Sequence, residues 1–330
     1  MKMVILNVDE STPGVNETAN VASLQITVAG MVKLSGRGLH SGRDTHVVIH
    51  PAPENTGIVF SDGTQMIRGL AANVVDTSRG TTIGSNGARI RTVEHLMAAL
   101  RGTGVDNALV EVLGPEAPAL DGSALPYVEA IDSVGLIELG ARRKTVVLSQ
   151  PVWIQRNGSF VLAVPAPQLR ITYVMSYDHP MIGSQLATYV FGEGDFADEI
   201  APARTFVIYE EVAGLLDNDL ARGGSLDNVI VVWRDHLSSQ LRFPDELARH
   251  KVMDLVGDLS LVGGLLHAEV LAVKSGHALN VDFTREVSRV IARRPRRTST
   301  TAGRKAAAEV RTRRPELTTQ LSSLNTKHSS

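Results

Sequence analysis

Three side chains that could bind a metal ion recur at intervals of four residues in the segment RHKVMDLVGDL. They are His250, Asp254 and Asp258, and on an α-helix residues i, i+4 and i+8 lie along one side. The other positions of the segment are largely apolar, and a buried carboxylate without a partner is unfavourable. A divalent cation would supply the partner, because imidazole and carboxylate are both ligands of Zn2+ in proteins. The competing interpretation is a solvent-exposed helix face with one incidental histidine.

Glu94 and His95 form a second candidate pair, in the segment TVEHLMAAL. In zinc hydrolases a glutamate takes the proton from the attacking water, so a carboxylate beside a potential ligand fits that chemistry. The spacing is not that of the HExxH motif, and a Glu-His dipeptide is common. The pair therefore carries weight only together with other residues.

A third histidine, His277, follows Gly276 in the segment KSGHALN. Glycine permits a tight turn and a close approach of substrate. His277 could act as a general acid if a carboxylate kept it protonated. Asp258 is available for this role if His250 and Asp254 hold the metal. The alternative is a surface histidine in a turn.

Thr205 and Lys251 offer a hydroxyl and an ammonium group that could both stabilise a developing oxyanion. Each has a simpler interpretation. Thr205 is of a residue type that often caps helices, and Lys251 could be a surface lysine beside a buried histidine.

Composition restricts the classes of protein and of metal site. With 330 residues, of which 43% are hydrophobic, the chain is long enough for two globular domains. It has no cysteine, so any metal must be held by His, Asp or Glu, and disulfides and a cysteine nucleophile are excluded. The first residues resemble neither a signal peptide nor a transit sequence, and no apolar stretch approaches the roughly 18–20 residues of a membrane span. We therefore expect a cytoplasmic protein.

Charge is unevenly distributed along the chain. The formal net charge is -2, but residues 285–330 hold twelve Lys and Arg against three Asp and Glu. An acidic body with a basic end does not resemble a nucleic-acid-binding protein with a basic face. We expect residues 289–330 to form a basic, disordered tail, and residues 1–27 to form an N-terminal extension.

Between these ends, short strands with glycine-rich turns alternate with two histidine-bearing helices. The apolar spacing predicts one helix at 92–100, with Thr92 as its N-cap, and another at 245–263. A glycine loop and an apolar strand follow each helix. This repeated helix–loop–strand order suggests a duplicated α+β unit. His95 and His250 would then occupy equivalent helices and meet where the two units pack against each other.

Eight segments occur in collinear order within residues 28–288: GRGLHSG, TVEHLMAAL, GVDNALVEV, APALDGSALPYV, ARTF, GGSLDN, RHKVMDLVGDL and KSGHALN. Together they resemble the UDP-3-O-acyl-N-acetylglucosamine deacetylases, which are zinc enzymes of lipid A synthesis in Gram-negative bacteria. The combination of TVEHL, HKxxDxxGD and KSGHALN is specific to this family.

The resemblance implies a metal site and a general base. His95, His250 and Asp254 would bind Zn2+ and leave room for water and the substrate carbonyl. Glu94 would act as the general base on that water, which attacks the amide of the N-acetyl group.

The resemblance also implies how the amide bond breaks. Zn2+, Thr205 and Lys251 would stabilise the tetrahedral oxyanion. His277, charged and oriented by Asp258, would protonate the departing glucosamine nitrogen. Acetate would then leave together with UDP-3-O-acyl-glucosamine.

The fold implied by the resemblance is α+β, with two similar two-layer α/β sandwiches packed through their helices. The first domain would span residues 28–143 and the second residues 144–288. A small βαβ insert in the second domain, near 204–232, would form a passage for the acyl chain. Its candidate lining residues are Phe206, Ile208 and Tyr209, although ordinary core packing would explain them as well.

The nucleotide would lie on an aromatic and basic surface. Tyr177 could stack on uracil and Lys274 could meet the diphosphate. The expected partner is thus a UDP-linked acylated amino sugar. We expect a monomer with no nucleic-acid partner and no transmembrane segment, and with no more than transient contact with a membrane surface. The alternative function is that of a non-catalytic sugar-nucleotide or lipid-binding protein on the same fold.

Overall fold

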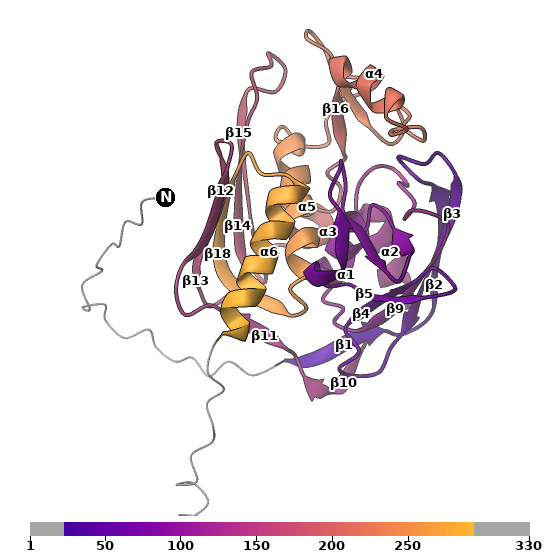
Figure 1. The fold of residues 1–330 in the computed structure, drawn as a ribbon, viewed down its shortest axis with the longest axis vertical. Coiled ribbons are helices and arrows are strands. Elements are labelled where there is room, and N and C mark those ends of the chain that lie inside the picture. Colours follow the sequence, from indigo (N-terminus) through magenta and orange to yellow (C-terminus); the bar gives the residue numbers. More distant parts are fainter. Residues whose placement is uncertain (1–22, 294–330) are drawn as a thin grey trace, which may run out of the picture. The chain divides into compact units, whose positions relative to one another are not determined.

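Two β-sheets enclose the helices that carry the candidate residues. The computed structural model describes residues 23–293, and Figure 1 shows one sheet, then α5 and α6, then α1 and α2, and then the other sheet. The helices span Glu94–Gly102 for α1, Leu125–Val134 for α2, Glu246–Ser260 for α5 and His277–Ala292 for α6. The fold is of the mixed α+β class, as predicted.

The first sheet comes from the N-terminal half of the chain and has the strand order β2-β3-β9-β4-β5. Its strands have one covered face, as in β3, where Val47 and Ile49 are buried and His46 is exposed. The bounds are Val32–Arg37 for β2, Asp44–Pro51 for β3, Ile58–Ser61 for β4, Met66–Arg68 for β5 and Ala108–Leu113 for β9.

The second sheet, from the C-terminal half, has the order β12-β13-β18-β14-β15, and β11 also pairs with β18. From one edge strand to the other, the four successive pairs of neighbouring strands are antiparallel, antiparallel, parallel and antiparallel in both sheets. The bounds are Thr145–Val147 for β11, Val152–Arg156 for β12, Ser159–Pro165 for β13, Arg170–Ser176 for β14, Ser184–Val190 for β15 and Leu265–Val273 for β18. The two halves therefore share one pattern of strand pairing.

Helices α1 and α5 pack closely together between the sheets. Every residue of α1 from Glu94 to Leu100 is buried, and the apolar residues of both halves form one continuous cluster. Gly257 of α5 lies against the backbone of Glu94, and a Cβ at Gly257 would overlap the carbonyl oxygen of that residue. Glycine at this position therefore permits the close approach of the two helices.

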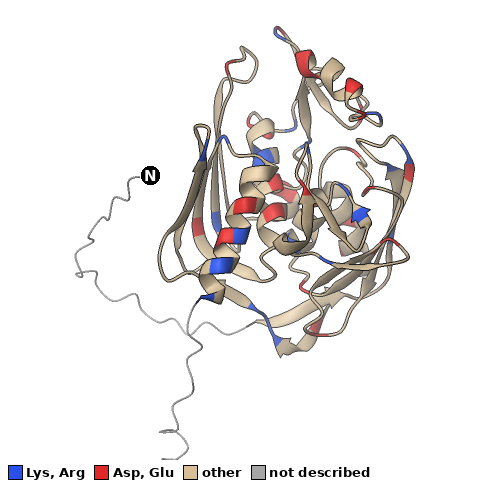
Figure 2. Ribbon diagram, viewed as in Figure 1, with Lys and Arg blue, Asp and Glu red and all other residues tan. Residues whose placement is uncertain are grey.

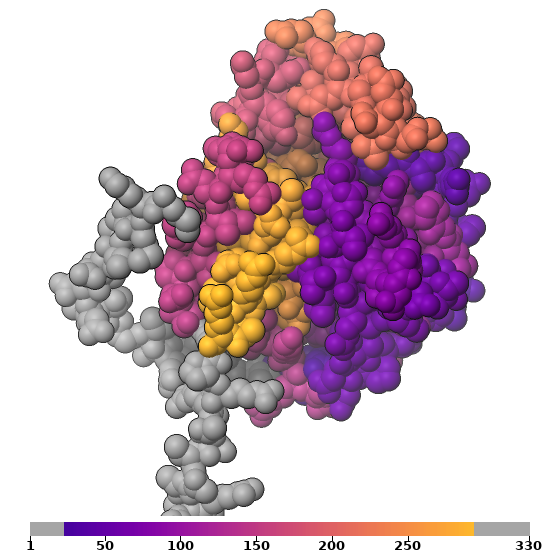
Figure 3. Space-filling model, viewed as in Figure 1, coloured from indigo at the N-terminus to yellow at the C-terminus, as the bar shows by residue number. Residues whose placement is uncertain are grey.

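A βαβ unit lies within the C-terminal half. Strands β16 (Phe206–Ile208) and β17 (Ile230–Val232) are parallel and are joined through α4 (Tyr209–Asp217). An ion pair of 2.7 Å between Arg79 and Glu211 connects α4 to the N-terminal half. Figure 3 shows the orange atoms of this unit against the purple atoms of that half. Arg79 follows the first strand of a three-stranded sheet formed by β6 (Val74–Asp76), β7 (Thr82–Ser85) and β8 (Ala88–Ile90).

Thr92 is not the N-cap of the first helix, which corrects the sequence prediction. The helix begins at Glu94 after Val93, and no side chain caps it. Thr92 has a positive φ of 55°, and its hydroxyl donates a hydrogen bond of 3.0 Å to Glu116. A tertiary hydrogen bond has therefore replaced the local one that the residue type favours.

A strand occupies the end of the segment that we predicted as an extension. Strand β1 (Leu24–Val28) pairs with β10 (Leu136–Arg142), whereas residues 1–22 lie outside the described residues. The buried side chains of β1 include Gln25 and Thr27, which hydrogen-bond to Asn107. Their polarity conceals the strand from a search for alternating apolar residues.

The C-terminal helix extends beyond the predicted end of the second domain. Helix α6 continues to Ala292, and Figure 2 shows both acidic and basic residues along it. Residues 294–330 of the predicted tail lie outside the described residues. Two short helical segments complete the fold, a 3-10 helix at Ala71–Asn73 and α3 at Phe196–Glu199. Among residues 23–293, no helix has both the length and the apolar composition needed to cross a membrane.

The substitution Gly257→Ala tests the contact between α1 and α5. The added methyl group would collide with the backbone of Glu94, so we expect the free energy of unfolding to fall by about 1–3 kcal/mol. Gly214→Ala in α4 is the matched control, because no atom lies within 4 Å of its Cβ position and alanine favours a helix by up to about 1 kcal/mol. Denaturant unfolding of both variants gives the comparison, and equal stability of the two would contradict the role of Gly257.

Candidate metal centre

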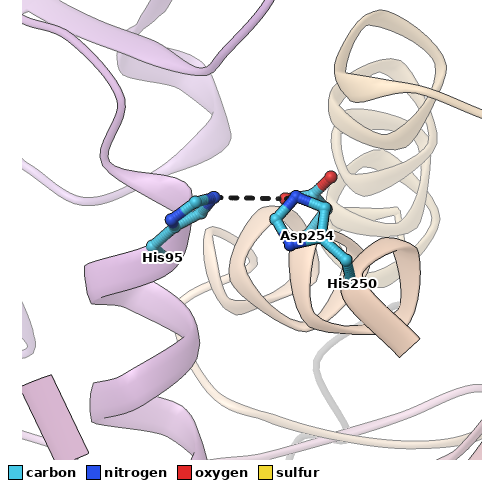
Figure 4. Close-up of side chains that lie close together, drawn as sticks. All are labelled: His95, His250 and Asp254. Atoms are coloured by element: carbon cyan, nitrogen blue, oxygen red, sulfur yellow. Dashed lines mark ion pairs between the residues drawn. The ribbon is translucent and has the colours of Figure 1, made fainter. Parts of the chain in front are cut away.

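His95, His250 and Asp254 converge from two helices that lie far apart in the sequence. Figure 4 shows His95 on α1 facing the other two residues on α5. The Nε2 atoms of His95 and His250 lie 3.6 Å and 3.5 Å from Oδ1 of Asp254. All three side chains are buried, and one ligand atom from each lies within 4.8 Å of the others. This is the geometry of a three-ligand site.

The Oδ1 atom of Asp254 is the strongest sign that a cation belongs there. It is buried and has no hydrogen-bond partner among residues 23–293. A buried carboxylate oxygen without a hydrogen-bond partner destabilises the folded chain unless a positive charge compensates it. The two imidazole nitrogens and this oxygen together fit a divalent metal ion.

The protonation of the neighbouring groups suits metal binding. The Nδ1 atom of His250 lies 3.1 Å from the carbonyl oxygen of Ala203, so a proton on Nδ1 would be donated to this carbonyl and would leave the Nε2 lone pair free. Burial lowers the pKa of His250 to about 3, which keeps the ring neutral. Burial alone would raise the pKa of Asp254, but His250 and the Lys251 ammonium, 2.9 Å from Oδ2, hold it well below its usual range.

Asp258, the third residue of the series on α5, contacts His277 and Asn280 of α6 rather than the three metal-site residues. Each step of four residues advances by about 40° around a helix of 3.6 residues per turn, so Asp258 points toward α6. It accepts hydrogen bonds from Thr81 at 2.6 Å and from Asn280 at 3.0 Å. The Nδ1 atom of His277 lies 3.0 Å from its Oδ2 atom.

His277 stands between Asp258 and the second candidate carboxylate. Its Nε2 atom lies 3.7 Å from Oε1 of Glu94 and 3.9 Å from Oδ2 of Asp254. Burial alone would lower the pKa of His277, but Asp258 and then Glu94 raise it to about 10. The imidazolium form is therefore favoured, with Nε2 directed toward the space beside Glu94.

Glu94 opens α1 directly before the metal-site residue His95. Its Oε2 atom accepts a hydrogen bond of 2.9 Å from the backbone N–H of Thr81. Burial raises the pKa of Glu94, although His277 and His95 oppose the shift. A buried carboxylate with a raised pKa can accept a proton near neutral pH.

Sequence reasoning missed Thr81, which links the two buried carboxylates. Thr81 is fully buried, and it donates to Glu94 through its backbone and to Asp258 through its hydroxyl. The only sequence signal was its position in the turn-rich segment before the first helix. Arg79 and Arg156, which line the cavity at the metal site, were also missed, since isolated arginines between strands carry no distinctive pattern.

One cavity of about 480 Å³ is lined by the three metal-site residues together with Glu94 and His277. Of the remaining candidates it includes Tyr177, Thr205, Phe206, Lys251 and Lys274. The Nζ atom of Lys251 lies 5.4 Å from the centre of the Phe206 ring, and the rings of Tyr177 and Phe206 lie edge to face at 6.2 Å. The cavity therefore has a charged, metal-binding floor and a partly aromatic wall.

The other residues that the sequence suggested for substrate binding or oxyanion stabilisation do not all lie at this cavity. Ile208 and Tyr209 do not line this cavity, and the exposed Tyr209 stacks on Trp233 at 5.2 Å. Thr205 precedes β16, and α4 begins only at Tyr209. Helix capping therefore does not account for Thr205, whose backbone N–H donates to Gly122 at 2.8 Å.

A three-residue metal site with a buried carboxylate and an imidazolium beside it is typical of metal-dependent hydrolases. Comparison with protein families agrees with this class. Residues 25–289 match the family described as UDP-3-O-acyl N-acetylglycosamine deacetylase. The match covers most of the chain, and the chain belongs to this family.

Curated relatives carry the name UDP-3-O-acyl-N-acetylglucosamine deacetylase. The protein of Myxococcus xanthus is 44% identical over 272 residues, which are 80% of this chain and 86% of the relative. The protein of Geotalea uraniireducens is 42% identical over 80% of this chain and 88% of its own length. The protein of Chlamydia caviae is 41% identical over 81% of this chain and 98% of its own length.

Metal analysis of purified variants tests the three-ligand site. We expect the wild-type chain to retain one divalent ion per molecule and Asp254→Asn to lose it, because the amide removes the charge that compensates the cation. The loss in affinity should exceed the roughly 10–100-fold cost of losing an outer-shell partner. Asp258→Asn, four residues along α5, is the control and should keep its ion. Equal metal content in the two variants would count against the assignment.

Proposed function

We propose that this chain is a Zn2+-dependent deacetylase that hydrolyses the N-acetyl amide of a UDP-linked 3-O-acyl-N-acetylglucosamine. The products would be acetate and UDP-3-O-acyl-glucosamine, a step of lipid A biosynthesis. Family membership supports the reaction. The observation that carries the proposal is the convergence of His95, His250 and Asp254 in one cavity with Glu94 and His277.

Zn2+ is the metal that this set of ligands suits best. Two imidazoles and one carboxylate are a ligand set of catalytic zinc sites, and the chain has no thiolate to offer. When bound, Zn2+ supplies a Lewis acid that polarises the amide carbonyl and acidifies the attacking water.

Glu94 takes the proton of the water as the new carbon–oxygen bond forms. Its raised pKa makes the carboxylate a stronger base than an exposed glutamate. The hydrogen bond from the backbone of Thr81 fixes Oε2 and leaves Oε1 directed toward His277. Oε1 is then the atom that receives the proton.

His277 donates a proton to the amide nitrogen as the carbon–nitrogen bond breaks. Asp258 holds Nδ1 and thereby directs Nε2 toward the space beside Glu94. The product amine departs neutral, and the second product is acetic acid, which becomes acetate when its remaining proton passes to solvent. Base and acid thus act beside one another on the same carbonyl centre, with Oε1 of Glu94 and Nε2 of His277 3.7 Å apart.

Lys251 and Thr205 stabilise the oxyanion that develops on the former carbonyl oxygen. Burial alone would lower the pKa of Lys251, but Asp254 raises it above its ordinary value, so the ammonium stays charged. The Thr205 side chain lines the same cavity. A fixed charge and a hydroxyl in a largely buried site act strongly on a developing negative charge.

The wall of the cavity would bind the rest of the substrate. We assign the uracil to Tyr177 and the diphosphate to Lys274, which both line the cavity. The acyl chain would follow the βαβ unit past Phe206 and Ile208 toward Tyr209. The exposed Tyr209 would then lie at the far end of the acyl path.

The arrangement of the sheets supports a division into two similar sandwiches, at 28–143 and 144–288. The shared pattern of strand pairing and the contact between α1 and α5 are what a duplicated unit packed through its helices requires. Monomeric state, cytoplasmic location and transient contact with a membrane surface stay predictions from the sequence.

The variant Glu94→Gln tests the base and the reaction together. We expect kcat for acetate release from the UDP-sugar to fall roughly 100- to 10,000-fold, because the amide cannot accept the proton. Metal content should stay at the wild-type level. Loss of the metal would show that Glu94 is a ligand or a structural residue, and unchanged turnover would exclude it as the base.

The pH dependence of kcat/KM tests His277. The acid must be protonated, so activity should be lost as the pH rises through the pKa of His277. Asp258→Asn removes the largest influence that raises this pKa, so the loss should begin at least one pH unit lower than in the wild-type chain. Glu286→Gln on the same helix, where Glu286 pairs with Arg289, is the control. An unshifted basic limb in the Asp258 variant would contradict the assignment.

A further inference from the structure

A second cavity, which we call the seam cavity, lies at the opposite end of α1 from the metal centre. Its volume is about 190 Å³, and its wall includes Arg68, Arg101 and Asp106 from the N-terminal half and Lys144 and Ser260 from the C-terminal half. Arg101 follows His95 by six residues, which is about 9 Å along the helix axis. The seam cavity shares no lining residue with the proposed active site.

The charges around the seam cavity do not balance. Arg68, Arg101 and Lys144 contribute three positive charges, and Asp106 is the one carboxylate in the lining. That carboxylate is already occupied, because its Oδ2 atom accepts hydrogen bonds from Arg143 at 2.8 Å and from the backbone of Ile26 at 2.9 Å. Within residues 23–293, neither Arg68 nor Lys144 forms an ion pair with a described residue.

Arg101 is the most confined of these cations. Its side chain is 10% exposed, its Nη1 atom lies 3.9 Å from Asp106, and its Nη2 atom donates to the carbonyl oxygen of Gly264 at 3.3 Å. Burial lowers the pKa of Arg101, and Asp106 offsets this effect only in part. A confined guanidinium with one distant carboxylate is a strong site for a further anion.

The cavity also has a hydrogen-bonded polar wall and room for a polyatomic ligand. Asn55 and Asn107, which line it, each hydrogen-bond to Gln25. The Nζ atom of Lys144 lies 3.9 Å from the Cβ position of Gly263, which places it at the cavity. The volume is several times the roughly 30 Å³ of a single water molecule. Figure 2 shows basic residues in the segment that joins β10 to β11.

We propose that the seam cavity binds a small phosphate-bearing anion, of which inorganic phosphate and diphosphate are the simplest examples. The guanidinium groups of Arg68 and Arg101 offer forked donors for phosphate oxygens, and Lys144 adds a charge from the other half of the chain. The anion would connect the two halves near the C-terminal ends of α1 and α5. Its binding would therefore stabilise the packing on which the metal centre depends.

A simpler role for these cations is to neutralise carbonyl groups at the ends of the two helices, as Arg101 does for Gly264. That role needs no ligand and predicts no saturable binding. In that role Arg68 and Lys144, which are exposed, would be solvated surface cations that need no partner. The two interpretations differ in a direct binding measurement.

The test is calorimetric titration of the full-length, metal-loaded chain with inorganic phosphate and, separately, with diphosphate in a buffer of low ionic strength. We expect saturable binding, with Lys144→Gln and Arg68→Gln each weakening Kd at least about tenfold, as loss of a charged hydrogen bond does. Lys33→Gln, an exposed lysine of β2, is the matched control and should change Kd less than about twofold. The melting temperature should rise with the anion in the wild-type chain and less in the two seam variants.

A variant in the proposed active site distinguishes anion binding in the seam cavity from anion binding in the active-site cavity. Lys274→Gln should bind phosphate as the wild-type chain does. Loss of binding in Lys274→Gln with full binding in Lys144→Gln would place the anion in the active site and overturn the proposal. Absence of saturable binding, or equal weakening in Lys33→Gln, would overturn it as well. The readout is binding, so the result is independent of deacetylation.

Discussion

The metal centre depends on the close packing of α1 against α5. His95 alone cannot hold a metal ion, and neither can His250 with Asp254, because a catalytic zinc site needs three protein ligands. Gly257 lets the backbone of α5 lie against that of Glu94, and this close approach helps to bring the three side chains together. Since the helices belong to different sheets, the whole α+β framework is needed to place ligand atoms within 4.8 Å of one another.

Three buried carboxylates share this site, and their partners give them different properties. Asp254 lies against Lys251 and His250, and its pKa falls well below the usual range even though burial opposes this. Asp258 accepts hydrogen bonds from Thr81 and Asn280 and holds His277. Glu94 has no cationic neighbour as close as that of Asp254, so burial prevails and raises its pKa. Under the proposed function, one kind of functional group would thus supply a ligand, an orienting group and a base.

Local sequence patterns were sufficient for the two helices and for their meeting, but not for side-chain hydrogen bonds between distant segments. The apolar spacing around His95 and His250 predicted both helices, and the repeated helix–loop–strand order indicated that they would meet. The role of Thr81 could not be found in this way, because its partner Asp258 lies 177 residues away. Thr92 was misassigned for a related reason, since its hydroxyl bonds to Glu116 in the folded chain rather than to the helix that follows it.

The two ends of the contact between α1 and α5 have opposite electrostatic character. Carboxylates gather at the end near His95, where a divalent cation fits, whereas Arg101 and Lys144 gather at the other end around a cavity with one occupied carboxylate. A cation at one end and an anion at the other would each compensate charges contributed by both halves of the chain. Binding at either end would then favour the same closed packing. Because both ligands stabilise one arrangement of α1 and α5, each would be linked to the other through that packing without any direct contact.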